Sequence, residues 1–107
     1  MAHARYADKR DGNDAELTRA LQAMVCCVWH LGRSPCDKLI LCPDGRLELA
    51  EIKDPTQRTK LTKTEEETAA ALQTRGRHLW ILQTVDDCAA IVANRIMELE
   101  INANGTS

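Results

Sequence analysis

The first apolar pattern in the chain repeats every three or four positions over residues 13–30. Its members are Leu17, Leu21, Met24, Val25 and Val28. This spacing places apolar side chains on one face of a helix, so it predicts an amphipathic helix over the whole range. Asn13 or Asp14 is suited to be the N-cap of this helix, and Gly32 is suited to end it.

The second pattern predicts a β-hairpin over residues 34–53. Residues 38–42 are almost continuously apolar, and Asp44-Gly45 is a strong signal for a tight turn. In the strand after the turn, alternate side chains share a face. One face then carries Leu47, Leu49, Glu51 and Lys53, and the other carries Glu48, Ala50 and Ile52. Two charged residues therefore continue an apolar row, where charges are costly unless they are paired or bound to a metal.

The rest of the chain predicts two helices and one strand. The spacing Thr62-x-x-Glu65 is that of a capping box, and it begins a helix over residues 63–74. Residues 78–83 are predicted to form a buried strand, and residues 85–98 a final helix. The order is α-β-β-α-β-α, which indicates an α/β fold. A hairpin and a β-α-β crossover would form a small mixed sheet flanked by helices.

Length and hydropathy indicate one domain. With 107 residues the chain can bury a single core, and we assign the domain to residues 12–98. Residues 1–11 and 99–107 are polar and are predicted to be an N-terminal arm and a C-terminal tail. No apolar run reaches the roughly 18 residues of a membrane span, and the start lacks the apolar core of a secretory signal. We therefore expect a cytoplasmic protein with no membrane partner.

The cysteines are expected to be structural. They are Cys26, Cys27, Cys36, Cys42 and Cys88. They form no C-x-x-C pair, and no histidine stands at zinc-finger spacing from them. We predict that they are small buried hydrophobic residues. A disulfide or zinc framework is the alternative.

A hairpin would bring three charged residues to one end of the sheet. They are Asp37, Glu51 and Lys53. Mg²⁺ and Mn²⁺ prefer oxygen ligands, so we expect the two carboxylates to bind one of these ions, with the backbone carbonyl of Ile52 as a further ligand. Such an ion activates water and polarises a phosphate. The Lys53 ammonium would reach the attacking water or the phosphorane, so the pattern indicates phosphodiester chemistry.

Basic residues provide candidate contacts for nucleic acid. The net charge of −2 does not exclude a nucleic-acid enzyme, because acids at a metal site offset bases along a phosphate track. The candidates for phosphate contacts are Arg58, Lys60 and Lys63, together with Lys9 and Arg10 of the N-terminal arm. Each would add affinity that does not depend on base sequence. No aromatic platform accompanies them, which argues against a single-strand stacking groove.

These residues carry a family resemblance. Asp37, followed by a hairpin and Glu51-Ile52-Lys53, resembles the D…(D/E)-x-K core of the PD-(D/E)xK nuclease superfamily. Within it, the chain is most similar to the small VRR-NUC type, including stand-alone phage versions. The matching features are Asp11-Gly12-Asn13-x-x-Glu16, Gly32, Asp37, Glu51-Ile52-Lys53, Leu61-Thr62-x-x-Glu65, Gly76 and Val85-Asp86. They span about residues 11–95.

The resemblance implies a restriction-endonuclease-like core and an endonuclease that hydrolyses DNA with Mg²⁺ or Mn²⁺ and no organic cofactor. It also implies action on branched DNA such as a Holliday junction, a homodimer, and Glu16 as an additional acid that acts directly on the metal or through water. The chain departs from the family pattern at two places. Cys36 stands before the aspartate where a proline is usual, and Glu65 or Glu66 stands where a glutamine is common.

Each candidate residue also has a purely structural explanation. Asp37 can cap a turn after Pro35. Glu51 and Lys53 can form a cross-strand ion pair, and a helix dipole favours an acid such as Glu16 in the first turn. The bases can be solvated without a ligand. The alternative function is therefore a nuclease-like module that binds nucleic acid or assembles with a partner and does not hydrolyse it.

Overall fold

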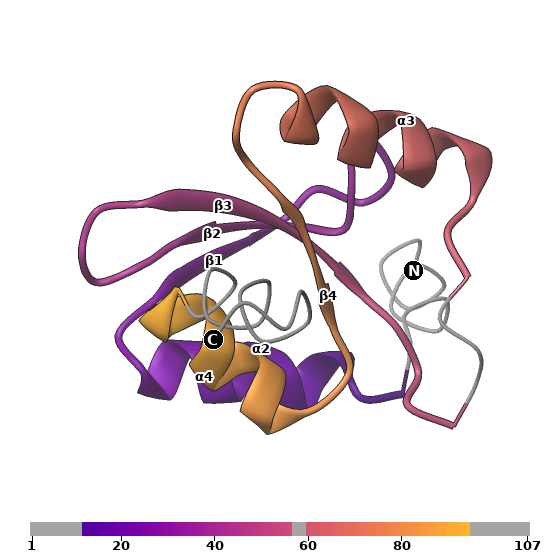
Figure 1. Cartoon of the computed structure of the whole chain (residues 1–107). Coiled ribbons are helices and arrows are strands. Elements are labelled where there is room, and N and C mark those ends of the chain that lie inside the picture. The colour runs from indigo at the N-terminus through magenta and orange to yellow at the C-terminus, as the bar shows by residue number, and fades with distance from the viewer. Residues whose placement is uncertain (1–11, 57–59, 95–107) are drawn as a thin grey trace, which may run out of the picture.

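The computed structural model describes residues 12–56 and 60–94. Within these ranges three helices surround a four-stranded sheet (Figure 1). In chain order the elements are α2 (Asp14–Ala23), β1 (Cys27–His30), β2 (Lys38–Leu41), β3 (Leu47–Ile52), α3 (Lys63–Gln73), β4 (Leu79–Leu82) and α4 (Val85–Ala93). The α/β fold class expected from the sequence is confirmed.

The sheet is mixed and has the strand order β1-β2-β3-β4. β2 is antiparallel to both of its neighbours, β1 and β3, whereas β4 is parallel to β3. A parallel pair needs a crossover connection, and α3 provides it between β3 and β4. The predicted hairpin and β-α-β unit are therefore both present. The carboxyl ends of β3 and β4 lie at the same end of the sheet.

Helices cover both faces of the sheet, and one face holds the main core. α2 and α4 lie together on one side, and α3 lies on the other (Figure 1). The core cluster joins the sheet to α2 and α4, and its members are Leu17, Leu21, Cys26, Ile40, Cys42, Ala50, Ile52, Trp80, Leu82, Cys88 and Ile91. α3 has no buried residue. Its position on the sheet therefore depends more on polar contacts than on apolar burial.

The first predicted helix, over residues 13–30, is too long. It ends at Ala23, and Cys27–His30 instead forms the edge strand β1 beside β2. The backbone turns at Val25, whose φ of +67° lies in the left-handed region. The order is therefore α-β-β-β-α-β-α. A short apolar segment fits either a helix or a strand by its pattern, and the backbone bonds to β2 decide in favour of the strand.

Two glycines show where the turns are. Gly45 has a φ of +92° and its N–H donates to the carbonyl of Cys42, as expected for the hairpin turn. Gly32, predicted to end the first helix, lies between β1 and β2 with a φ of +91°. Its positive φ fits glycine, which has no Cβ to clash, but the turn that it serves joins two strands.

The starts of the last two helices follow the sequence prediction. The Thr62 hydroxyl accepts from the Glu65 N–H, and the Glu65 carboxylate accepts from the Thr62 N–H, so the capping box of α3 is confirmed. At α4, the Asp87 carboxylate accepts from the N–H groups of Gln83 and Thr84. The predicted helix over residues 85–98 is too long, because α4 ends at Ala93 and Asn94 caps it with a left-handed φ of +55°. The N-terminal arm and the C-terminal tail lie outside the described residues.

The cysteines are free thiols, and four of the five are buried as predicted. Cys27, on the edge strand, is the exposed one. Burial raises the pKa of Cys36, Cys42 and Cys88 to about 11, so these thiols stay protonated and poorly reactive at neutral pH. Within the described residues, no helix has both the length and the apolar character needed to cross a bilayer.

Candidate active site

Asp37 and Glu51 face each other across β2 and β3. The strand register pairs Lys38 with Ala50, so the next position outward pairs Asp37 with Glu51. Because Ala50 belongs to the core, the two carboxylates project from the opposite face of the sheet, which α3 covers. The Ile52 N–H donates to Asp37 Oδ2 at 2.9 Å and orients that carboxylate. We call Asp37 and Glu51 the carboxylate pair.

Glu51 is the most buried member of the site, with 2% of its surface exposed. Burial raises the pKa of Glu51 to about 9, and the hydrogen bond and charge of Asp37 add to the effect. The charge of Glu65 also raises this pKa, while that of Lys53 lowers it. Two carboxyl groups this close cannot both ionise without compensation. The pair therefore needs a shared proton or a cation.

Lys53 lies beyond the end of β3, two residues from Glu51 and on the same face. Its ammonium is 2.9 Å from Glu65 Oε1 of α3. Its backbone is fixed as well, because its N–H donates to the Leu82 carbonyl and its carbonyl accepts from Asn13 Nδ2. Burial alone would lower the pKa of Lys53, but the neighbouring carboxylates outweigh burial and raise it. Lys53 is therefore a cation held beside the carboxylate pair.

Glu65 has two roles, of which sequence analysis found one. Its Oε1 closes the α3 capping box and also accepts from the Lys53 ammonium. Burial alone would raise the pKa of Glu65, but Lys53 and the Thr62 N–H hold it below its ordinary value. Glu65, which stands where the family commonly has a glutamine, is thus an ionised member of the site. The signal in the sequence was the capping-box spacing, which explained Glu65 without reference to Lys53.

The other predicted site side chains that the structure describes are those of Glu16, Lys60 and Lys63, and all three are exposed. Glu16 is exposed on α2, in the layer opposite α3. Burial is the main cause of the raised pKa of Cys88, and the charge of Glu16 makes a smaller contribution to it. Lys60 and Lys63 are exposed at the start of α3. The remaining predicted bases, Arg58, Lys9 and Arg10, lie outside the described residues.

Cys36, which stands where a proline was expected, does not displace the aspartate that follows it. Its side chain is fully buried, and its Sγ donates to the Lys38 carbonyl at 3.4 Å. The neighbouring Asp37 points to the other face and pairs with Glu51 as the strand register requires. The departure at this position therefore leaves the geometry of the carboxylate pair intact.

A buried ion pair that the sequence pattern did not indicate lies behind the site. Lys38 is 2% exposed, and its ammonium lies 2.8 Å from Asp14 Oδ2 and contacts His30 Nδ1. In the same turn of α2, Asn13 Nδ2 donates to the carbonyls of Lys53 and Gln83. The first turn of α2 thus ties together the start of β2 and the ends of β3 and β4. These are the backbone segments that carry the candidate site.

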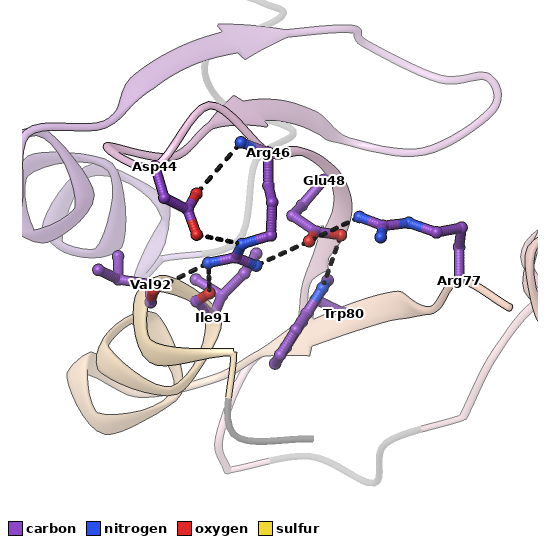
Figure 2. Close-up of polar contacts among 7 residues, drawn as sticks. All are labelled: Asp44, Arg46, Glu48, Arg77, Trp80, Ile91 and Val92. Atoms are coloured by element: carbon purple, nitrogen blue, oxygen red, sulfur yellow. Dashed lines mark hydrogen bonds and ion pairs between the residues drawn. The ribbon is translucent and has the colours of Figure 1, made fainter. Parts of the chain in front are cut away.

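A second missed group lies on the core face of the sheet, where Glu48 accepts from three side chains (Figure 2). They are Arg46 and Arg77, each at 2.8 Å, and Trp80 through its indole N–H at 3.2 Å. Arg46 also donates to two carbonyls at the C-terminal end of α4. We call these residues the Glu48 network. It joins the hairpin to β4 and α4, and it lies on the opposite face from the carboxylate pair.

The carboxylate pair fits a small, hard divalent cation by its chemistry. Its donors are carboxylate oxygens, which Mg²⁺ and Mn²⁺ prefer. Within the two described ranges, no group of three or more His, Cys, Asp or Glu side chains is arranged to hold a metal ion. Mg²⁺ commonly keeps several waters and uses only one or two carboxylates. A site built on Asp37 and Glu51 is of that kind.

Comparison with known proteins bears on the fold. No protein-family model and no curated protein matches the chain. Among solved structures, a VRR_NUC domain matches with a TM-score of 0.60 and 20% sequence identity, over 75% of this chain and 89% of that one. The chain has a VRR-NUC-like fold. The resemblance inferred from the motifs is confirmed at the level of the fold. The VRR-NUC-like sheet carries the carboxylate pair and Lys53 at one end.

Proposed function

We propose that this chain is a metal-dependent endonuclease that hydrolyses DNA phosphodiester bonds. The observation that carries the proposal is the meeting of Asp37, Glu51 and Lys53 at one end of a nuclease-like sheet. Two carboxylates beside an ammonium provide ligands for a cation and a positive charge for a phosphate. The family resemblance of the motifs and the VRR-NUC-like fold support the same assignment.

Each residue of the proposed site has a distinct task. Asp37 and Glu51 would hold Mg²⁺ or Mn²⁺, with the Ile52 carbonyl as a further ligand. Glu16, which the family resemblance implied as an additional acid, is exposed in the opposite layer, so any contribution from it would pass through water. A divalent cation supplies charge stabilisation for a reacting phosphodiester. The Ile52 N–H keeps the Asp37 carboxylate turned toward Glu51. Lys53, protonated and fixed by its backbone bonds, would stabilise the charge that develops on the phosphate oxygens.

DNA would be held mainly through its phosphates. Lys60 and Lys63 are exposed at the end of α3 that carries Glu65, and Arg58, Lys9 and Arg10 complete the proposed contacts. Such contacts give affinity that falls with salt and ignores base sequence. We further propose that the substrate is branched DNA, such as a Holliday junction, and that the enzyme works as a homodimer in the cytoplasm.

A second candidate is a module with the same fold that binds nucleic acid without hydrolysis. The observation that favours it is the pairing of Lys53 with Glu65, which occupies the ammonium in the structure. This alternative predicts salt-sensitive DNA binding and no cleavage. It also predicts that binding does not depend on Asp37.

Cleavage assays separate these functions. The protein would be incubated with supercoiled plasmid and with a four-way junction, in Mg²⁺, in Mn²⁺ and in EDTA. We expect cleavage in either metal, none in EDTA, and a loss of about 100-fold or more in Asp37→Asn. Asp86→Asn is the matched control, because Asp86 is exposed at the start of α4.

Two results of this assay would overturn the proposal. One is the absence of cleavage of every substrate, in which case salt-sensitive binding of the junction would support the second candidate. The other is metal-dependent cleavage that Asp37→Asn leaves unchanged, because the activity would then reside elsewhere. Light scattering at the mass of two 11.9 kDa chains would support the homodimer.

A further inference from the structure

The Glu65 carboxylate connects α3 to the candidate site. One of its oxygens, Oε1, lies 2.9 Å from both the Lys53 ammonium and the Thr62 N–H. The side chain is largely shielded from solvent, with 16% of its surface exposed. An ion pair that is shielded in this way holds its partners more firmly than an exposed pair. The position of the Lys53 ammonium therefore depends on the cap of α3.

Polar contacts contribute to holding α3 over the site. No residue of this helix is buried. A second tie is the hydroxyl of Thr68, which donates to the carbonyl of Pro35, two residues before Asp37. Both ties are polar, and both reach segments that carry proposed site residues. Of the two residues that make these contacts, Glu65 is charged and Thr68 is not.

That charge matters because a phosphodiester is an anion. Asp37 and Glu65 both lie close enough to Glu51 to raise its pKa, and Lys53 is the cation among these carboxyl groups. A glutamine in place of Glu65 would keep the shape and remove one negative charge. The negative charge of Glu65 repels a phosphate and attracts a divalent cation.

We infer that Glu65 is a positioning residue with a second effect: it fixes the Lys53 ammonium, and its charge makes DNA binding depend on prior occupation of the site by a divalent cation. This inference rests on the proposed function and adds an order of binding to it. With a divalent cation bound, the negative charge of Asp37, Glu51 and Glu65 would be offset, and the site would no longer repel an entering phosphodiester.

The test is DNA binding with and without a divalent cation. Fluorescence anisotropy would measure the affinity for a labelled four-way junction in EDTA and in Ca²⁺, an oxygen-preferring cation. Glu65→Gln keeps the capping box, because glutamine also serves at that position. Glu66→Gln removes the same charge from the next residue of α3, which is exposed, and is the matched control.

We expect the wild-type protein to bind weakly in EDTA and more tightly in Ca²⁺. Glu65→Gln should bind more tightly in EDTA, which would reduce the gain from Ca²⁺ on the order of fivefold. Its maximal cleavage rate in Mg²⁺ should fall about tenfold with an unchanged KM, because a less firmly held Lys53 affects the transition state more than binding. Glu66→Gln should match the wild type in all three measurements.

The outcomes separate this inference from the proposed function. If the wild type cleaves DNA with metal but Glu65→Gln behaves like Glu66→Gln, the role of Glu65 is wrong and the nuclease assignment stands. If Glu65→Gln loses activity only through unfolding, its urea midpoint falls and its EDTA affinity does not rise, which also overturns the inference. If the wild type binds no DNA in either condition, both fail.

Discussion

Lys53→Met is expected to lower the rate of DNA cleavage by about 100- to 1,000-fold, the usual cost of removing a group that stabilises transition-state charge. The Lys53 ammonium lies 2.9 Å from Glu65 and on the face of the carboxylate pair. Methionine has a similar length and leaves the backbone bonds to Leu82 and Asn13 in place. The loss should therefore come from the missing charge and not from unfolding. Single-turnover cleavage with saturating metal measures it.

Arg19→Met is the control for Lys53→Met. Arg19 is an exposed base of α2, in the layer opposite α3, so its removal changes the net charge equally without touching the site. We expect its cleavage rate to match the wild type. Equal rates for Lys53→Met and Arg19→Met would remove Lys53 from the mechanism.

Glu48→Ala is expected to destabilise the chain by about 3 kcal/mol, within the range for breaking a buried charge pair. Glu48 is 4% exposed and accepts from Arg46, Arg77 and Trp80 (Figure 2). Alanine leaves the Trp80 N–H and part of the Arg46 guanidinium without an acceptor, and the cost of an unsatisfied buried donor adds to that of the lost pair. Urea unfolding followed by circular dichroism measures the change in the free energy of unfolding.

Glu67→Ala is the control for this stability prediction. Glu67 is exposed on α3, and a substitution there should change the free energy of unfolding by less than about 0.5 kcal/mol. A loss for Glu48→Ala no larger than that of Glu67→Ala would show that the Glu48 network does not join the hairpin to β4 and α4 as described.

The hairpin and the carboxylate pair were predictable because both follow from local rules. Asp44-Gly45 marked the turn, and a turn at that place fixes the register between the strands that flank it. The register then sets Asp37 opposite Glu51, and the period of two places Lys53 on the same face. Because neighbouring residues of a strand point to opposite faces, Glu51 lies on the face opposite Ala50, which belongs to the core.

The edge strand β1 was not predictable in the same way. Cys27–His30 is four residues long, and its apolar residues continue the three-to-four spacing of α2 by chance. Two features make this segment a strand: it pairs with β2, and the backbone before it makes a left-handed turn at Val25. The spacing of apolar residues in the sequence reveals neither feature. A β-branched residue is an unexpected choice for that conformation.

The buried charges were missed because their partners are distant in sequence. Lys38 and Asp14 are 24 residues apart, and Glu48 and Trp80 are 32 apart. A lysine, an aspartate or a glutamate is most often a surface residue, so nothing in the sequence marks Lys38, Asp14 or Glu48 as buried. Only the folded sheet, with α2 across it, shows that these charges are paired and shielded. The dual role of Glu65 has the same origin, because the capping box was local and its contact with Lys53 was not.

Asp37 and Glu51 are proposed to bind a divalent cation at the end of the sheet, and the nuclease assignment depends on this site. The most direct measurement is the broadening of backbone amide NMR signals by substoichiometric Mn²⁺. We predict that the first signals to broaden belong to residues 37 and 51–53, and that Asp37→Asn abolishes this pattern. Broadening centred elsewhere, such as the acidic first turn of α4 with Asp86 and Asp87, or a pattern that Asp37→Asn leaves unchanged, would contradict the claim.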